Sequence, residues 1–139
     1  MPKKKKIVKK KVKLTLREQN VIKECKQIIS KHPKLKRKKL DKMKDLDKRL
    51  YYIKVWAITE SQPLDKLRNS KKRCWKGSGC HHLDHIVPIS KGFTDNIPPE
   101  HIGSLTNLRF IHWSKNIRKG STMTEASHRT LRKLKRIKK

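Results

Sequence analysis

The sequence predicts an α+β protein with helices in its first half, then a two-stranded antiparallel hairpin with a long loop and a helix, and finally a basic C-terminal helix. Apolar residues recur at helical spacing between positions 15 and 58. From position 74 to position 120 this periodicity disappears, and Gly, Pro, His and Asn accumulate around two short segments that alternate as strands do. We therefore expect four parts: a disordered basic arm (1–14), a helical region (15–73), a hairpin-and-helix core (74–121) and a basic helix (122–139).

The composition points to a polyanionic partner. The chain of 139 residues carries 40 Lys and Arg against 11 Asp and Glu, a formal net charge of +29. Charge of one sign on this scale repels itself unless a polyanion neutralises it, so we expect DNA bound largely through its phosphates. A membrane surface fits less well, because the basic segments lack the apolar face that settles a helix into lipid headgroups. The lysines of residues 1–14 would form a phosphate-binding arm, and residues 15–73 would support the core or bind DNA.

Two helices are expected in the first half. Thr15 and Glu18 form the pattern of a capping box, and the apolar spacing that follows stops at His32 and Pro33. A second, longer helix is predicted from residue 40 to residue 58 and should pack on the first. Cys25 lies on the apolar stripe of the first helix and is expected to be buried. The aromatic residues of the second helix are expected to fill the core, with stacking on bases as the alternative; they are Tyr51, Tyr52 and Trp56.

The second half predicts the order strand, long loop, strand, helix, helix. Residues 82–88 and 106–112 are expected to be antiparallel strands, joined by a loop rich in Gly and Pro. Residues 113–119 form a short helix that the following glycine ends. A second capping box, from Thr122 to Glu125, should open the C-terminal helix. The apolar side of that helix comprises Leu131, Leu134 and Ile137.

The adjacent residues Asp84 and His85 carry chemistry suited to phosphodiester hydrolysis. Such hydrolysis needs a water nucleophile, a base to deprotonate it and a cation to stabilise the developing negative charge. A carboxylate offers hard oxygen to a divalent cation, and an imidazole with an ordinary pKa of about 6.5 can take a proton at neutral pH. Neighbouring side chains of a strand diverge, so one can hold the cation while the other acts from another side.

The order and spacing of these residues resemble those of the HNH endonuclease family. The resemblance is carried by LDHIVPIS, the glycine Gly92, NLRFI and SKNIRKG, which together span residues 83–120. It implies the ββα-metal (His-Me finger) fold for residues 74–121, in the HNN variant whose final histidine is an asparagine. It also implies hydrolysis of DNA to a 3′ hydroxyl and a 5′ phosphate, with nicking by a monomer.

The resemblance further implies a role for each motif residue. Asp84 and Asn116 would be ligands of one divalent ion, and His85 would be the general base. Asn107 would be the middle residue of the motif, bonding the loop backbone and holding His85 in place. Carboxylate and amide oxygens suit Mg²⁺ or Mn²⁺ better than Zn²⁺, so one of these two ions is the implied cofactor.

Two other segments, residues 92–104 and 56–59, look like those of small phage endonucleases. They point to an enzyme of phage or mobile-element type, for which homing, DNA packaging and host DNA degradation are all possible roles. The composition supports equally well a non-catalytic, basic nucleic-acid-binding protein in which Asp84 and His85 are structural. These two classes of protein differ in whether the chain cleaves DNA at all.

Further residues near the motif are candidates for binding. His82 shares a strand face with Asp84. It is expected to be an additional metal ligand, a phosphate contact or a surface histidine. Arg118 and Lys119 follow the motif and are expected on backbone phosphates. A structural zinc ion is not expected, because the spacing of its candidate ligands is irregular. These candidates are Cys74, Cys80 and His112, with His81 or His101.

The sequence predicts a cytoplasmic protein. No apolar run reaches the length of about 18 residues that a membrane span needs. The lysines near the N-terminus are followed by no apolar stretch of the kind that secretory signals contain, so we expect neither secretion nor membrane insertion. Three cysteines, an odd number, in a chain of this kind predict reduced thiols.

Overall fold

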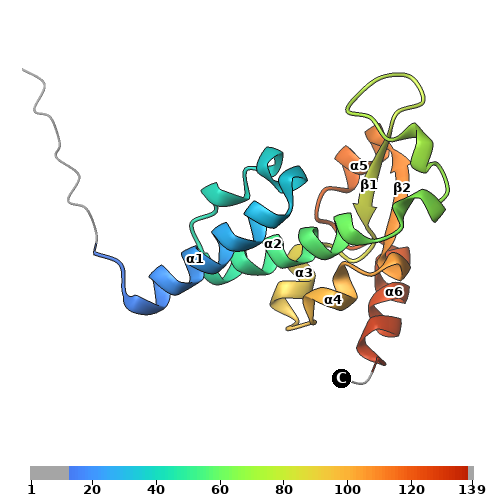
Figure 1. Ribbon diagram of the computed structural model, residues 1–139. Helices are drawn as coiled ribbons and strands as arrows, with labels where there is room; N and C mark the ends of the chain where they lie inside the picture. The colour runs from blue at the N-terminus through green and yellow to red at the C-terminus, as the bar shows by residue number, and fades with distance from the viewer. Residues whose placement is uncertain (1–12, 138–139) are drawn as a thin grey trace, which may run out of the picture.

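A computed structural model describes residues 13–137, apart from the side chains of Arg37 and Asp41. The chain forms a helical half around two long helices and a second half around a two-stranded antiparallel hairpin, as the sequence predicts (Figure 1). The basic arm predicted for residues 1–14 lies almost entirely outside the described residues. None of the helices in the described part is long and apolar enough to cross a membrane.

Helix α1 (Leu16–Lys31) confirms the first predicted helix. The Thr15 hydroxyl accepts a hydrogen bond from the Glu18 N–H at 3.2 Å, and the Glu18 carboxylate accepts one from the Thr15 N–H at 2.7 Å. This reciprocal pair satisfies backbone donors that the first turn of a helix otherwise leaves free. The helix ends at His32, where Pro33 begins a short 3₁₀ segment.

Helix α2 (Leu46–Ser61) begins later than predicted. The stretch before it forms two 3₁₀ segments, η1 (Pro33–Lys38) and η2 (Leu40–Lys42), on either side of Lys39, whose φ is +50°. The Asp45 side chain accepts a hydrogen bond from the Lys48 N–H at 3.1 Å and so starts the helix there. Apolar spacing extended the prediction back to residue 40, because Leu40 is buried without being part of the helix.

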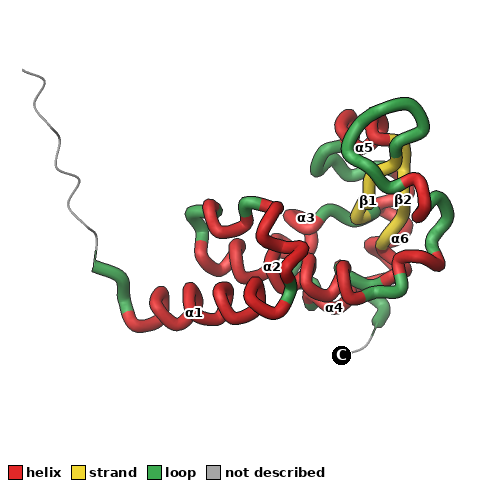
Figure 2. The backbone as a smooth tube through the Cα atoms, turned by 45° about the horizontal axis from the view of Figure 1, so that its top comes forward, coloured by secondary structure: helices red, strands yellow, loops and turns green. Residues whose placement is uncertain are grey.

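Helix α2 packs against both halves of the molecule, as Figure 2 shows. With α1 it encloses a first cluster of buried residues: Cys25, Leu35, Leu40, Ile53 and Ala57. With the second half it encloses another, which comprises Val55, Val87, Ile89, Ile97, Ile102, Leu131 and Leu134. The three aromatic residues of α2 are partly buried against these clusters, which confirms their predicted role in the core.

The hairpin follows two further 3₁₀ segments, η3 (Leu64–Lys66) and η4 (Ser70–Lys72). Strand β1 (His81–His85) pairs antiparallel with β2 (Leu108–His112), so both predicted strands are present with shifted ends. In this register Asp84 lies opposite Arg109, and His85 lies opposite Leu108.

The connection between the strands is not the open loop that the sequence predicts. It contains α3 (Ile89–Thr94), α4 (Pro99–Ile102) and the 3₁₀ segment η5 (Leu105–Asn107). Gly92 is required by close packing, since a Cβ there would lie 2.5 Å from the Tyr51 hydroxyl and 2.6 Å from Ile102 Cγ1. These helices are too short for apolar periodicity to reveal them in a sequence.

The hairpin is followed by α5 (Trp113–Lys119), which ends at Gly120 with a φ of +50°, as predicted. The capping box of helix α6 (Glu125–Lys135) lies two residues later than predicted, because Thr124 and Ser127 form it instead of Thr122 and Glu125. Its residues Leu131 and Leu134 are buried in the core, whereas Ile137 is 47% exposed. Helix α6 is therefore a packed element of the second half.

Candidate active site

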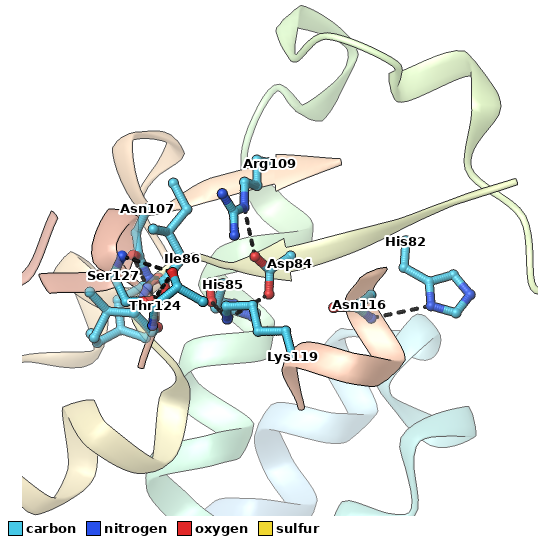
Figure 3. Close-up of polar contacts among 12 residues, drawn as sticks. His82, Asp84, His85, Ile86, Asn107, Arg109, Asn116, Lys119, Thr124 and Ser127 are labelled. Carbon is cyan, nitrogen blue, oxygen red and sulfur yellow. Dashed lines mark hydrogen bonds and ion pairs between the residues drawn. The ribbon is translucent and has the colours of Figure 1, made fainter. Parts of the chain in front are cut away.

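A cavity of about 270 Å³ lies where β1, α2 and α5 meet. Three of the residues singled out in the sequence line it: Asp84, His85 and Asn116. They come from the end of β1 and from α5, as Figure 3 shows. The hairpin and the helix therefore bring a carboxylate, an imidazole and a carboxamide to one cavity.

The His85 imidazole is held in one orientation by a hydroxyl from α2. His85 is 7% exposed, and its Nε2 lies 2.9 Å from Oγ1 of Thr59. The Thr59 hydroxyl donates its own proton to the Val55 carbonyl at 2.8 Å, so it is available to His85 as an acceptor. Nε2 must then carry the proton, which leaves the lone pair on Nδ1. Nδ1 has no hydrogen-bond partner among residues 13–137 and keeps contact with solvent, since every fully buried polar side-chain atom there has a partner.

The surroundings of His85 keep its ring neutral. The Trp56 ring meets it edge-on, with ring centroids 4.8 Å apart. Burial, together with the positive charges of Lys38 and Lys119, lowers the pKa of His85 to about 3. At neutral pH this imidazole is therefore a proton acceptor and not a cation.

Asp84 is held in place by two cations. It is 4% exposed; its Oδ2 accepts a hydrogen bond from Arg109 Nε at 2.8 Å, and its Oδ1 accepts one from Lys119 Nζ at 3.0 Å. The Lys119 ammonium also donates to the His85 carbonyl at 3.0 Å and is itself buried. The prediction that Lys119 contacts DNA phosphates was therefore wrong, because α5 turns this side chain inward against Asp84.

Asn116 is oriented by His82. His82 Nε2 lies 2.6 Å from the Trp75 carbonyl, which can only accept, so this nitrogen carries the proton. His82 Nδ1 then accepts from Asn116 Nδ2 at 3.2 Å. The amide oxygen of Asn116 is left without a partner in the described part of the chain. Because both ring nitrogens of His82 are already engaged, the arrangement does not favour the predicted use of His82 as a metal ligand or phosphate contact.

The donor set at this cavity fits a hard divalent cation. The Asp84 carboxylate and the free amide oxygen of Asn116 are oxygen ligands of the type that Mg²⁺ and Mn²⁺ prefer. The carboxylate already binds a cationic group, the ammonium of Lys119, and each carboxylate oxygen has two lone pairs to offer. With two protein ligands, most of the coordination shell would belong to water and substrate.

Asn107 closes the loop behind the strands and does not line the cavity. It is fully buried; its Oδ1 accepts from the Val87 N–H at 2.8 Å, and its Nδ2 donates to the carbonyls of Val87 at 3.2 Å and Ile102 at 2.8 Å. Its backbone carbonyl also accepts from the Ile86 N–H at 2.8 Å. The predicted contact with the loop backbone is confirmed, and it fixes the segment that directly follows His85.

The zinc candidates are placed differently. Cys74 and Cys80 form a disulfide with their Cα atoms 5.3 Å apart, so the prediction of reduced thiols was wrong for this pair. Cys25 is free and buried, as expected. Nδ1 of His112 lies 2.7 Å from the Ser114 hydroxyl. No group of three or more His, Cys, Asp or Glu side chains within residues 13–137 is arranged to hold a metal ion.

Sequence reasoning missed three residues of this site: Thr59, Arg109 and Trp56 in its role beside His85. Thr59 directly follows the apolar run of residues 55–58, and in the structure it is fully buried. Such a residue must have hydrogen-bond partners, so its position pointed to a polar contact inside the core. Arg118, by contrast, is exposed, and its expected phosphate contact stays a prediction.

Comparison of the chain with protein-family models, with curated proteins and with solved structures finds no match. What the cavity can do is therefore inferred from its own side chains.

Proposed function

We propose that the protein is a DNA endonuclease of the HNH type, dependent on Mg²⁺ or Mn²⁺, whose ββα-metal core is formed by β1, β2 and α5. The observation that carries the proposal is the meeting of Asp84, His85 and Asn116 at one cavity. Asp84 and His85 are neighbours on β1, whereas Asn116 follows on α5, and the motif order that suggested them requires that Asn116 meet this pair. An asparagine that only stabilised a turn would have no reason to lie in the same cavity as the pair.

His85 is the residue that takes the proton from the attacking water. Its neutral form, with the proton on Nε2 and the lone pair on Nδ1, is the form that a general base needs at neutral pH. Thr59 is a positioning residue that keeps this tautomer and ring orientation. A pKa of about 3 makes the ring a weak base in the free protein. Neutralisation of Lys38 by a DNA phosphate would raise that pKa, while burial, the main cause of the low value, would continue to lower it.

Asp84 and Asn116 are the residues that would hold the cation. A divalent ion there would stabilise the negative charge that develops on the phosphate and the leaving oxygen during cleavage. Arg109 and Lys119 orient the Asp84 carboxylate by hydrogen bonds, and Asn107 fixes the chain that follows His85. The 3′ hydroxyl and 5′ phosphate products follow from the resemblance, as does nicking by a monomer.

The charge of the chain supports DNA as the substrate. A net charge of +29 gives strong, salt-dependent attraction to phosphates, and Arg118 is exposed in the last turn of α5. This attraction is independent of base sequence. A phage or mobile-element origin belongs to the same proposal and is supported by the sequence resemblance alone.

One observation favours the second candidate, a non-catalytic nucleic-acid-binding protein. Each Asp84 oxygen accepts a hydrogen bond from a cation, Arg109 or Lys119, and a buried carboxylate with two cationic partners can be a purely structural feature. In that case a cation would have no role at Asp84. DNA binding would be the whole function.

Incubation with supercoiled plasmid separates these two candidates. The endonuclease proposal predicts conversion to nicked circles with Mg²⁺ or Mn²⁺ and none with EDTA, and ends that a DNA ligase reseals, because they carry 3′ hydroxyl and 5′ phosphate groups. Binding in EDTA without cleavage under any metal would instead support the binding protein. First-order appearance of linear DNA without a nicked intermediate would contradict nicking by a monomer.

A further inference from the structure

A wide groove lies next to the candidate active site. Its volume is about 990 Å³, and it is lined by Pro33, Lys34, Lys38, Lys39, Trp56, Glu60, Arg73 and Trp75. Trp56 lines both this groove and the cavity that contains Asp84 and His85, so a chain lying in the groove would lead directly to the site. We call it the Trp75 groove.

The Trp75 groove carries an excess of positive charge. Four cationic side chains line it, against the single carboxylate of Glu60. That carboxylate is used mainly by Arg73, whose Nη2 lies 2.7 Å from Glu60 Oε1, whereas Lys34 and Lys38 each lie 3.9 Å from it. Lys34 is 73% exposed. Spare cations in an open groove are suited to phosphates of a nucleic-acid backbone.

Trp75 is the most exposed large hydrophobic residue of the described chain, at 87%. Exposure of an indole to water is unfavourable. The loop that carries Trp75 is nevertheless held in place by two contacts. The Cys74–Cys80 disulfide closes this loop, and the Trp75 carbonyl accepts a hydrogen bond from His82. The chain thus presents an uncovered aromatic face beside a row of cations.

An aromatic face beside cations is the arrangement that binds unpaired bases. In a duplex each base is stacked between its neighbours, so its face is hidden from a side chain; an unpaired base can stack on an indole while its phosphate meets a lysine. The cations alone would serve duplex and single strand equally. Trp75 is the feature that distinguishes the two.

We propose that the Trp75 groove binds a single-stranded segment of DNA, with a base stacked on Trp75 and the backbone along the exposed lysines Lys34 and Lys39. Binding of a single strand has a consequence that rests on the proposed endonuclease function. The enzyme should cut best where unpaired nucleotides lie beside the scissile phosphodiester. Bubbles, flaps and single-stranded overhangs are substrates of this class.

Binding is tested first, with the full-length protein in EDTA and a fluorescein-labelled oligothymidylate of about twelve nucleotides. Trp75→Ala should weaken this binding roughly tenfold, and Trp75→Phe, which keeps a stacking face, should recover most of it. Leu16→Ala is the matched control, because Leu16 is 74% exposed and lies at the start of α1. Equal affinity of the wild type, Trp75→Ala and Leu16→Ala would overturn the proposal.

A second pair of variants tests the backbone path. Lys34→Gln should reduce the slope of log affinity against log salt by about 0.7, the value for one phosphate contact on a single strand. Lys26→Gln, on α1 and outside the groove, should leave the slope unchanged. Identical slopes for both variants would place the strand elsewhere and contradict the proposed path.

Cleavage is then compared on a duplex and on the same duplex with a central bubble, both with Mg²⁺. The wild type should prefer the bubble, and Trp75→Ala should lose that preference while it still cuts the duplex. Cleavage of both substrates at equal rates would contradict the proposed single-strand binding in the Trp75 groove. It would leave the proposed endonuclease function standing. Trp75-dependent binding without any cleavage would instead overturn the endonuclease and, with it, the proposed substrate preference.

Discussion

The Thr59 hydroxyl lies 2.9 Å from Nε2 of His85 and donates its own proton to the Val55 carbonyl, 2.8 Å away. Because a hydroxyl has a single proton to donate, Thr59 can only accept from His85. This relationship fixes which nitrogen of the imidazole carries the lone pair of a base. It links a residue of α2 to the proposed chemistry on β1.

Replacing Thr59 by Val should lower the rate of plasmid nicking roughly 10- to 100-fold, because the His85 ring loses the acceptor that fixes its tautomer. DNA affinity in EDTA should not change. Thr59→Ser keeps the hydroxyl and should restore most of the rate, which a purely steric role would not predict. Nicking by Thr59→Val at the wild-type rate would show that this hydrogen bond is irrelevant to the reaction.

Replacing Asn107 by Ala should lower the free energy of unfolding by about 3 kcal/mol, because the buried N–H and carbonyl groups of Val87 and the Ile102 carbonyl lose their partner. Urea denaturation measures the change. Thr106→Ala is the control: Thr106 is an exposed neighbour, so its loss should cost no more than about 0.5 kcal/mol. Equal stability of the two variants would contradict the role assigned to the carboxamide.

Replacing Lys119 by Met removes one cation from a buried carboxylate and should destabilise the protein in EDTA by about 3 kcal/mol. If Asp84 and Asn116 bind a divalent ion, Mg²⁺ should raise the melting temperature of this variant more than that of the wild type, because the ion replaces the lost charge. Lys115→Met, an exposed change on the same helix, should show neither effect. If Mg²⁺ does not raise the melting temperature of Lys119→Met more than that of the wild type, the result would contradict a cation site at Asp84.

The low pKa of His85 predicts loss of stability in mild acid. Burial, with Lys38 and Lys119, lowers the pKa to about 3 in the folded chain, against 6.5 for an ordinary histidine. Protons therefore bind the unfolded chain first, so the contribution of the neutral ring is complete above about pH 6.5 and falls as the pH drops toward 3. Between about pH 7.5 and pH 5, in EDTA, the wild type should lose about 2 kcal/mol more than His85→Gln. Parallel urea curves for the two proteins would contradict a buried, neutral His85.

Much of the architecture could be predicted because its signals are local. The Thr15 and Glu18 capping box and Gly120 after α5 each act within a few residues, and both marked their helix ends correctly. The two strands alternate in the sequence and pair antiparallel in the structure. The motif order also led to Asp84, His85 and Asn116, which share a cavity.

The remaining features depend on contacts between distant parts of the chain. The start of α2 is set by Asp45, whereas the apolar pattern continues into 3₁₀ turns that are buried for reasons of packing. Lys119 looked like a surface cation because sequence alone does not show which way the last turn of α5 faces. Likewise, the hydrogen bond between His85 and Thr59 joins residues 26 positions apart, and no local sequence pattern predicts it.

The proposed role of His85 as the base is tested most directly by the Mg²⁺-dependent rate at which His85→Ala nicks supercoiled plasmid, measured beside the wild type at equal DNA occupancy. If His85 takes the proton from the attacking water, the variant should bind DNA as the wild type does and nick it at least about 100-fold more slowly. A His85→Ala protein that nicks within about threefold of the wild-type rate would contradict the account. So would a wild-type protein that nicks no DNA with Mg²⁺ or Mn²⁺.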